Sequence, residues 1–152
     1  MAALRLKLIV PIAISAVVGI TLWLVIDPPG QIRRVIDRQL ENRARNFLTA
    51  VGSYYKELYE YPWDTLGQPD PVGAVVQEKW LRQLSESGFV DGNFVRYSRW
   101  EKVYITQQGE MLYACFSPLS TAFKGIAEVQ GWKRDGSLGC QKDCFECLVS
   151  GK

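Results

Sequence analysis

The sequence predicts an α+β protein in which an N-terminal transmembrane helix continues into a long amphipathic helix that packs on a small antiparallel sheet. Three observations lead to this prediction. Residues 8–26 form an uncharged apolar run. Apolar residues then recur every three or four positions as far as residue 58, as on one face of a helix. Finally, residues 103–106 and 111–116 are rich in β-branched and aromatic residues and flank a glycine-containing connection, which is typical of a β-hairpin.

The apolar run is long enough to cross a bilayer. It has 19 residues, and at about 1.5 Å per residue it spans roughly 28 Å, close to the hydrocarbon thickness. A cleaved signal peptide is the alternative, but the run ends without a small-x-small cleavage motif, which favours an uncleaved anchor. Small residues on one side would allow close helix approach. The residues assigned to this membrane and assembly helix are Leu8, Ile9, Pro11, Ala13, Ala16, Gly19, Trp23 and Ile26.

We expect the chain to have four parts with a fixed orientation. Arg5 and Lys7 precede the anchor, and the segment after it carries four cysteines, which suit an oxidising compartment. We therefore expect the N-terminus to be cytoplasmic and the larger segment to be periplasmic or extracellular. The four parts are a cytoplasmic end (1–7), a transmembrane helix (8–26), an amphipathic helical extension (27–60) and a small exported head with a cysteine-rich tail (61–152).

The charges of the exported part cancel. Two of the 18 basic residues precede the anchor, and the remaining 16 balance the 16 acidic residues, so we expect no direct contact with nucleic acid. Asp37 and Glu41 interleave at helical spacing with a local group of arginines. This pattern favours a solvated, salt-bridged face beside the membrane headgroups. The arginines are Arg33, Arg34, Arg38, Arg43 and Arg45.

The apolar stripe of the second helix predicts how the head is organised. We expect a helix over residues 31–59 whose Phe47, Val51, Tyr54 and Leu58 side packs on the hairpin sheet, because a lone amphipathic helix is marginally stable in water. A break is expected near the two prolines that follow Asp27. The other expected elements are a shorter helix over 74–87, short strands at 93–96 and 132–137, and an irregular tail from residue 139.

The residue types argue against catalysis. The chain has no histidine, which excludes Ser/His/Asp triads, Cys/His pairs and histidine-containing metal sites. Asp64, Asp70 and Glu78 fall in or beside a predicted loop, where no partner for general acid–base chemistry is evident. We therefore expect a protein that is not an enzyme and that uses no cofactor or metal.

The four cysteines predict two disulfides. An even number in a small exported domain is the usual disulfide signature, although a four-cysteine zinc site remains an alternative. Four cysteines allow three connectivities. One bond should tie the tail to the strand that contains Cys115, with Cys140 the slightly favoured partner. The candidates are Cys115, Cys140, Cys144 and Cys147.

Residues 27–62, DPPGQIRRVIDRQLENRARNFLTAVGSYYKELYEYP, follow an apolar anchor as a charged helix that leads to a Tyr-Tyr pair and a terminal Tyr-Pro. In this arrangement the chain resembles the bacterial type IV pilins and the pseudopilins of type II secretion systems. Residues 115–123, CFSPLSTAF, also look like segments of divergent members. The chain has no acidic residue before Asp27 and so lacks the glutamate of the prepilin motif.

The resemblance implies a pilin-like fold and a structural role. It implies a major or minor subunit of a type IV pilus or of a type II secretion-like filament, which assembles through its N-terminal helix. The partners would be other pilin-like subunits, the membrane and the assembly machinery of the pilus or secretion system. The alternative is a membrane-anchored extracellular binding or adhesion module that does not polymerise.

Overall fold

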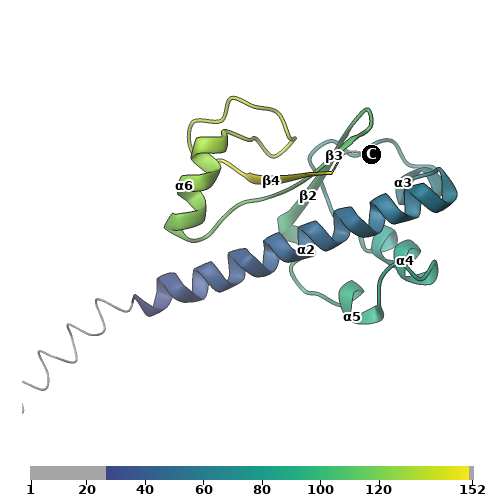
Figure 1. Ribbon diagram of the computed structural model, residues 1–152, viewed down its shortest axis with the longest axis horizontal. Helices are drawn as coiled ribbons and strands as arrows, with labels where there is room; N and C mark the ends of the chain where they lie inside the picture. Colours follow the sequence, from purple (N-terminus) through teal and green to yellow (C-terminus); the bar gives the residue numbers. More distant parts are fainter. Residues whose placement is uncertain (1–26, 151–152) are drawn as a thin grey trace, which may run out of the picture.

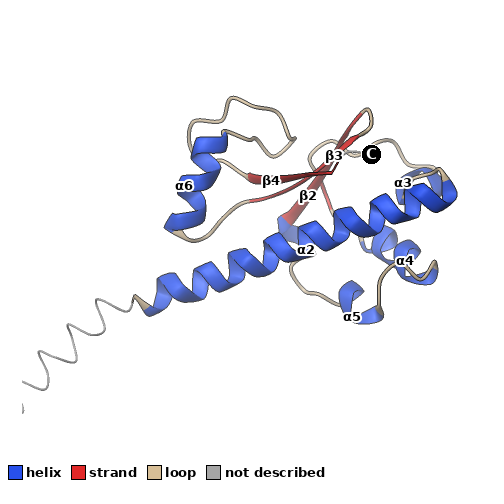
Figure 2. Ribbon diagram, viewed as in Figure 1, coloured by secondary structure: helices blue, strands red, loops and turns tan. Residues whose placement is uncertain are grey.

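A computed structural model describes residues 27–150 and confirms the α+β class. A long helix, α2 (Pro28–Leu58), runs along a four-stranded antiparallel sheet, and its N-terminal end projects beyond the head (Figure 1). Five short helices and the sheet lie along α2 beyond its projecting end (Figure 2). The head is therefore organised around this one helix.

The start of α2 is specified by local sequence. Asp27 is the N-cap residue, and its side chain accepts a hydrogen bond from the Gly30 amide at 3.3 Å. Pro28 and Pro29 occupy the first helical turn, where a missing N–H costs nothing and the fixed φ angle suits a helix. The helix ends at Leu58, and Tyr59 follows in the left-handed conformation. Helix α2 thus covers most of the segment predicted to be an amphipathic helix, residues 27–60, and the prolines lie in its first turn.

The sheet has the strand order β1-β2-β3-β4, with every pair antiparallel. The predicted hairpin is present, and its first strand is two residues longer than expected, so that only Gly109 and Glu110 connect the strands. Gly109 has a φ of 59°, which a two-residue hairpin turn of this kind requires. The strands are β1 (Ala74–Val75), β2 (Val103–Gln108), β3 (Met111–Phe116) and β4 (Glu146–Ser150).

Four local expectations about the head are wrong. Residues 74–75 pair with β2, so the helix expected over 74–87 spans only 78–86. The segment expected as a strand at 93–96 is helical, because the Asp91 carboxylate accepts a hydrogen bond from the Phe94 amide and begins a helix there. The helices are α3 (Pro62–Thr65), α4 (Glu78–Glu86), α5 (Gly92–Val95), η1 (Trp100–Lys102) and α6 (Thr121–Gln130).

The other two errors concern the C-terminal third of the chain. Trp132 makes isolated bridges to Leu138 and Phe145 in place of the strand expected over 132–137. The tail expected to be irregular contains β4, which pairs with β3 from residue 146 to residue 150. The formation of β4 depends on pairing with β3, a distant segment that local composition does not reveal.

Three of the four side chains of α2 that were predicted to pack on the sheet are buried. Phe47 and Val51 are fully buried, and Tyr54 is 1% exposed. The helix contacts β3 and β4, and the Phe47 ring lies 5.9 Å from the Trp100 ring. Leu58 is the exception, because it is 47% exposed. Residues 56–60 are all exposed, so the helix runs one turn past the elements that cover this face.

The membrane prediction falls largely outside the described residues. No helix within residues 27–150 combines the length and the apolar character needed to cross a bilayer. The predicted transmembrane helix of residues 8–26, together with its eight assigned assembly residues, lies outside this range. The described part of the molecule is therefore the helical extension and the head.

Truncation of Phe47 tests the packing of α2. Phe47→Ala should lower the free energy of unfolding by about 3–5 kcal/mol, since it removes a buried ring and leaves a cavity. Leu58→Ala is the matched control and should change this free energy by less than about 1 kcal/mol, as is usual for exposed positions. Urea unfolding of the detergent-solubilised chain, followed by tryptophan fluorescence, gives both values. Equal midpoints for the two variants would show that α2 is not part of the core.

Candidate functional site

Two buried carboxylates lie where α2, α6 and β4 meet. Asp37 of α2 is fully buried, and Glu146 at the start of β4 is 7% exposed. Elements far apart in the sequence bring them together, since α2 contacts both β4 and α6. Buried charges are costly unless they are paired or hydrogen-bonded, so these two residues mark the chemically unusual part of the head.

Asp37 fastens α6 to α2. Its two carboxylate oxygens accept hydrogen bonds from the amides of Leu119 and Ser120, both at 2.8 Å. Ser120 is the N-cap of α6, and its side chain accepts in turn from the Phe123 amide. A negative charge beside a helix N-terminus is favourable because the helix dipole is positive there. Asp37 thus joins α2 to the start of α6 through hydrogen bonds to residues 82 and 83 positions farther along the chain.

Among the described residues, Glu146 has no hydrogen bonds comparable to those that stabilise the carboxylate of Asp37. Its Oε2 atom is buried and has no hydrogen-bond partner among residues 27–150. Loss of hydration is the main cause that raises the pKa of Glu146 from its usual 4.5 to about 7. Repulsion from Glu41 and Asp37 raises this pKa further, whereas Arg45 opposes the increase. Glu146 is therefore a titratable group in the neutral pH range, inside the contact between α2 and the sheet.

The sequence interpretation missed both carboxylates as buried residues. Asp37 was assigned to a salt-bridged surface, but it belongs to the apolar stripe, because Leu40, Ala44 and Phe47 follow it at steps of three, four and three and are buried with it. This spacing was the available signal for Asp37. Glu146 offered none, since its burial depends on the pairing of β4 with β3.

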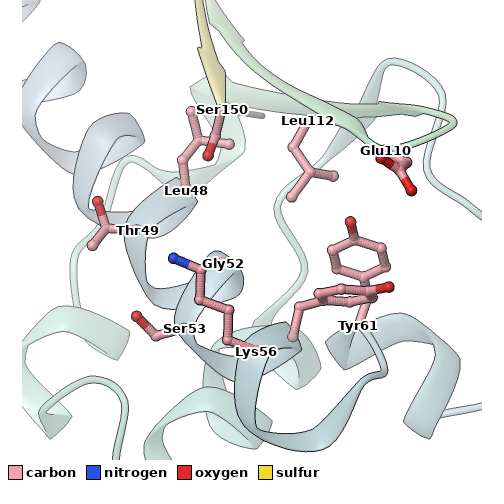
Figure 3. A pocket seen from close by; sticks show the side chains of 10 residues that line it. Leu48, Thr49, Gly52, Ser53, Lys56, Tyr61, Glu110, Leu112 and Ser150 are labelled. Atoms are coloured by element: carbon pink, nitrogen blue, oxygen red, sulfur yellow. The ribbon is translucent and has the colours of Figure 1, made fainter. Parts of the chain in front are cut away.

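A small pocket lies between α2 and the ends of the sheet. Its volume is about 220 Å³, and Figure 3 shows side chains of α2, the hairpin turn and the end of β4 around it. Lys56 and Glu110 contribute opposite charges, and Tyr61 contributes an aromatic ring. The Tyr61 ring also stacks on Tyr55 at 4.6 Å and on Trp63 at 5.1 Å. The pocket can hold a small polar group, but its lining contains no nucleophile paired with a general base.

The described residues offer no other group with evident chemistry. Within residues 27–150, no three His, Cys, Asp or Glu side chains are grouped so that they could hold a metal ion. Of the loop carboxylates considered from the sequence, Asp64 accepts a hydrogen bond from the Tyr61 amide at 2.9 Å and so caps the start of α3. The carboxylate of Asp64 therefore has a structural role at the start of this helix.

All four cysteines form disulfides, as predicted, but the favoured pairing is wrong. Cys115 bonds to Cys147, and Cys140 bonds to Cys144. Cys115 and Cys147 are directly opposed in β3 and β4 with Cα atoms 4.0 Å apart, which is the close approach of adjacent antiparallel strands. The tail is tied to Cys115 as expected, through a strand that the sequence interpretation had not identified.

Comparisons of the chain with protein-family models, with curated proteins and with solved structures give no match. Its function must therefore be argued from its own residues. The features available for that argument are the long helix with its projecting end, the buried carboxylates, the disulfide-bonded sheet and the distribution of charge along α2.

The two disulfides should differ in their contribution to stability. Cys115–Cys147 spans 32 residues and Cys140–Cys144 spans four, so the chain-entropy model gives about 4 and about 2 kcal/mol respectively. A Cys115→Ala/Cys147→Ala variant should therefore unfold at lower urea concentration than a Cys140→Ala/Cys144→Ala variant. Peptide mapping without reductant checks the pairing. Recovery of a Cys115–Cys140 peptide would contradict it.

The Glu146 carboxyl should make stability depend on pH. The folded chain retains this proton up to about pH 7, whereas the usual pKa is 4.5, so the free energy of unfolding should fall as pH rises between these values. At about 1.4 kcal/mol per pKa unit, the decrease is roughly 3 kcal/mol. Glu146→Gln should remove this decrease and be more stable than the parent chain at pH 8. Parallel stability curves for the two proteins between pH 5 and 8 would exclude this role.

Proposed function

We propose that this chain is a structural subunit of a type IV pilus or a type II secretion-like filament, anchored by residues 8–26 and assembled through its N-terminal helix. The observation that carries the proposal is the form of α2. It packs into the head through Phe47, Val51 and Tyr54, while its first turns project from the head (Figure 1). A helix of this kind has a free segment with which other copies can pack.

The side chains on the projecting turns support the same role. Ile32 is 62% exposed and Val35 is 53% exposed, and no element of the described residues covers them. Exposed apolar side chains are common singly. Here they lie a few residues after an uncharged, largely apolar run of 19 residues that also requires a partner. Packing between copies would bury both, with the small residues Ala13, Ala16 and Gly19 allowing close approach of the anchors.

The head supports a durable extracellular role. The disulfide between β3 and β4 fastens the edge strand to the sheet, and the second disulfide closes the preceding loop. Bonds of this kind persist in oxidising compartments. The resulting domain suits exposure outside the cytoplasm.

The pocket between α2 and the sheet supports the second candidate, a membrane-anchored binding module that does not polymerise. A concave site with a few convergent polar groups is the usual form of a ligand site. At about 220 Å³ the pocket is smaller than most sites for drug-sized ligands. We therefore rank binding below assembly.

Photo-crosslinking in the native cell separates the two candidates. With a benzophenone amino acid at position 35, illumination should give a ladder of covalent multimers of the chain, because this position lies on the projecting turns of α2. The matched position is 59, at the other end of the same helix, where Tyr59 is 80% exposed. It should give a much weaker ladder. Adducts to one unrelated protein, with no ladder at position 35, would favour the binding module.

A further inference from the structure

The five arginines of α2 differ in how the structure compensates their charge. Arg45 pairs with Glu41 at 3.0 Å. Arg43 lies over the aromatic rings of Phe94 and Tyr97, at 5.5 Å and 4.8 Å from their centroids, which is a favourable cation–π geometry. Arg43 is therefore engaged by the head, and Arg45 is paired within α2 itself.

The three arginines nearest the start of α2 have no such compensation. Arg33, Arg34 and Arg38 are exposed and form no ion pair with any carboxylate of residues 27–150. The acidic residues expected to neutralise them are occupied elsewhere, because Asp37 accepts the amides of Leu119 and Ser120 and Glu41 pairs with Arg45. The salt-bridged face predicted from the sequence is thus present at Glu41 and Arg45. The three arginines that precede this pair form an uncompensated cationic surface.

The cationic surface formed by these three arginines follows the predicted membrane anchor closely in the sequence, so the bilayer surface would lie beside it. The uncharged apolar run ends at residue 26, directly before the N-cap Asp27. At about 1.5 Å per residue, Arg33 and Arg34 lie roughly 9–10 Å along the axis from Asp27, and Arg38 lies roughly 16 Å from it. The headgroup layer is about 5–7 Å thick on each side of a bilayer. If the run crosses the bilayer, the nearest of these charges lie just above that layer.

Helix geometry directs the three side chains toward the membrane. Every Cα–Cβ bond of an α-helix tilts toward the helix N-terminus, which here is the end joined to the apolar run. The long side chains of Arg33 and Arg34 can extend along this direction and place their guanidinium groups among the headgroups. Ile32 and Val35, exposed between the arginines, supply apolar contact at the same level.

We propose that the start of α2 binds anionic phospholipid headgroups through Arg33 and Arg34, with Arg38 adding electrostatic attraction from farther above the surface. This inference rests on the proposed membrane anchorage of the chain. The partner is chosen by charge complementarity, since planar guanidinium groups pair with phosphate in a bidentate manner. This contact would hold the subunit upright at the membrane surface before assembly. The unpaired arginines would leave the lipid when the subunit enters a filament.

The test uses the full chain in nanodiscs of phosphatidylcholine, with or without phosphatidylglycerol. Hydrogen exchange, followed by mass spectrometry, should slow in residues 28–38 when phosphatidylglycerol is present and should recover at high salt. The slowing should be about fivefold for each arginine that reaches the headgroups. Exchange in α4, in the head, should be the same in both lipids.

Matched variants make the test specific. Arg33→Gln/Arg34→Gln/Arg38→Gln should abolish the lipid-dependent slowing. Lys56→Gln/Lys79→Gln/Arg82→Gln removes three exposed charges from the other end of α2 and from α4, and it should leave the slowing unchanged. Equal exchange of the parent chain in the two lipids would overturn the inference, as would slowing that depends on the number of copies per disc and not on lipid charge.

The outcomes also separate this inference from the proposed function. A chain that inserts in nanodiscs without any effect of phosphatidylglycerol contradicts headgroup binding and leaves filament assembly intact. A chain that shows the effect but gives no photo-crosslinked ladder supports headgroup binding and contradicts assembly. A chain that does not insert at all contradicts both, because both require the anchor.

Discussion

Burial of one face of α2 is the interaction on which the rest of the head depends. Leu40, Ala44, Phe47 and Val51 are fully buried along this face, and the helix contacts β3, β4, α4 and α6. None of these elements could form a stable core alone, because short strands and helices need a partner surface to bury their apolar side chains. The helix supplies that surface from Asp37 onward, and the turns before Asp37 remain largely uncovered by the head.

The two buried carboxylates show how the same type of residue can have opposite effects. Asp37 receives two backbone amides at 2.8 Å, so its burial is compensated and fixes the start of α6. Glu146 has an unpartnered oxygen and two acidic neighbours, so its charged form is unfavourable. One carboxylate holds the junction together, and we expect the other to make the stability of the same junction depend on pH. The difference is a matter of hydrogen-bond geometry, since both side chains are more than nine-tenths buried.

The arginines of α2 also differ between the turns that the head covers and the turns that it leaves uncovered. Where the head lies alongside the helix, Glu41 or aromatic rings engage the arginines. Where the helix projects, the arginines have no carboxylate partner within residues 27–150. An uncompensated cationic segment next to an apolar run is suited to a boundary between membrane and water. The proposed membrane contact and the proposed assembly would thus use the same projecting turns at different stages.

The sequence alone determined the features that depend on local spacing. Helical periodicity located α2 and three of its four predicted core positions, a glycine turn located the β2–β3 hairpin, and an even cysteine count indicated two disulfides. Each of these signals lies within one segment of chain or in the composition. The membrane helix at residues 8–26 is a prediction of the same kind, and it lies outside the described residues.

Only the tertiary structure decided the features that depend on distant segments. The tail became β4 because β3 offered a free edge, and this pairing placed Cys147 opposite Cys115 and buried Glu146. The same long-range packing turned Asp37 from an apparent surface charge into the residue that joins α2 to α6, and so left Arg33, Arg34 and Arg38 without their expected partners. Such outcomes depend on which surfaces meet in the folded chain. Spacing along the chain indicated that Asp37 belongs to the apolar stripe, but it did not indicate which amides Asp37 would accept or which strand β4 would join.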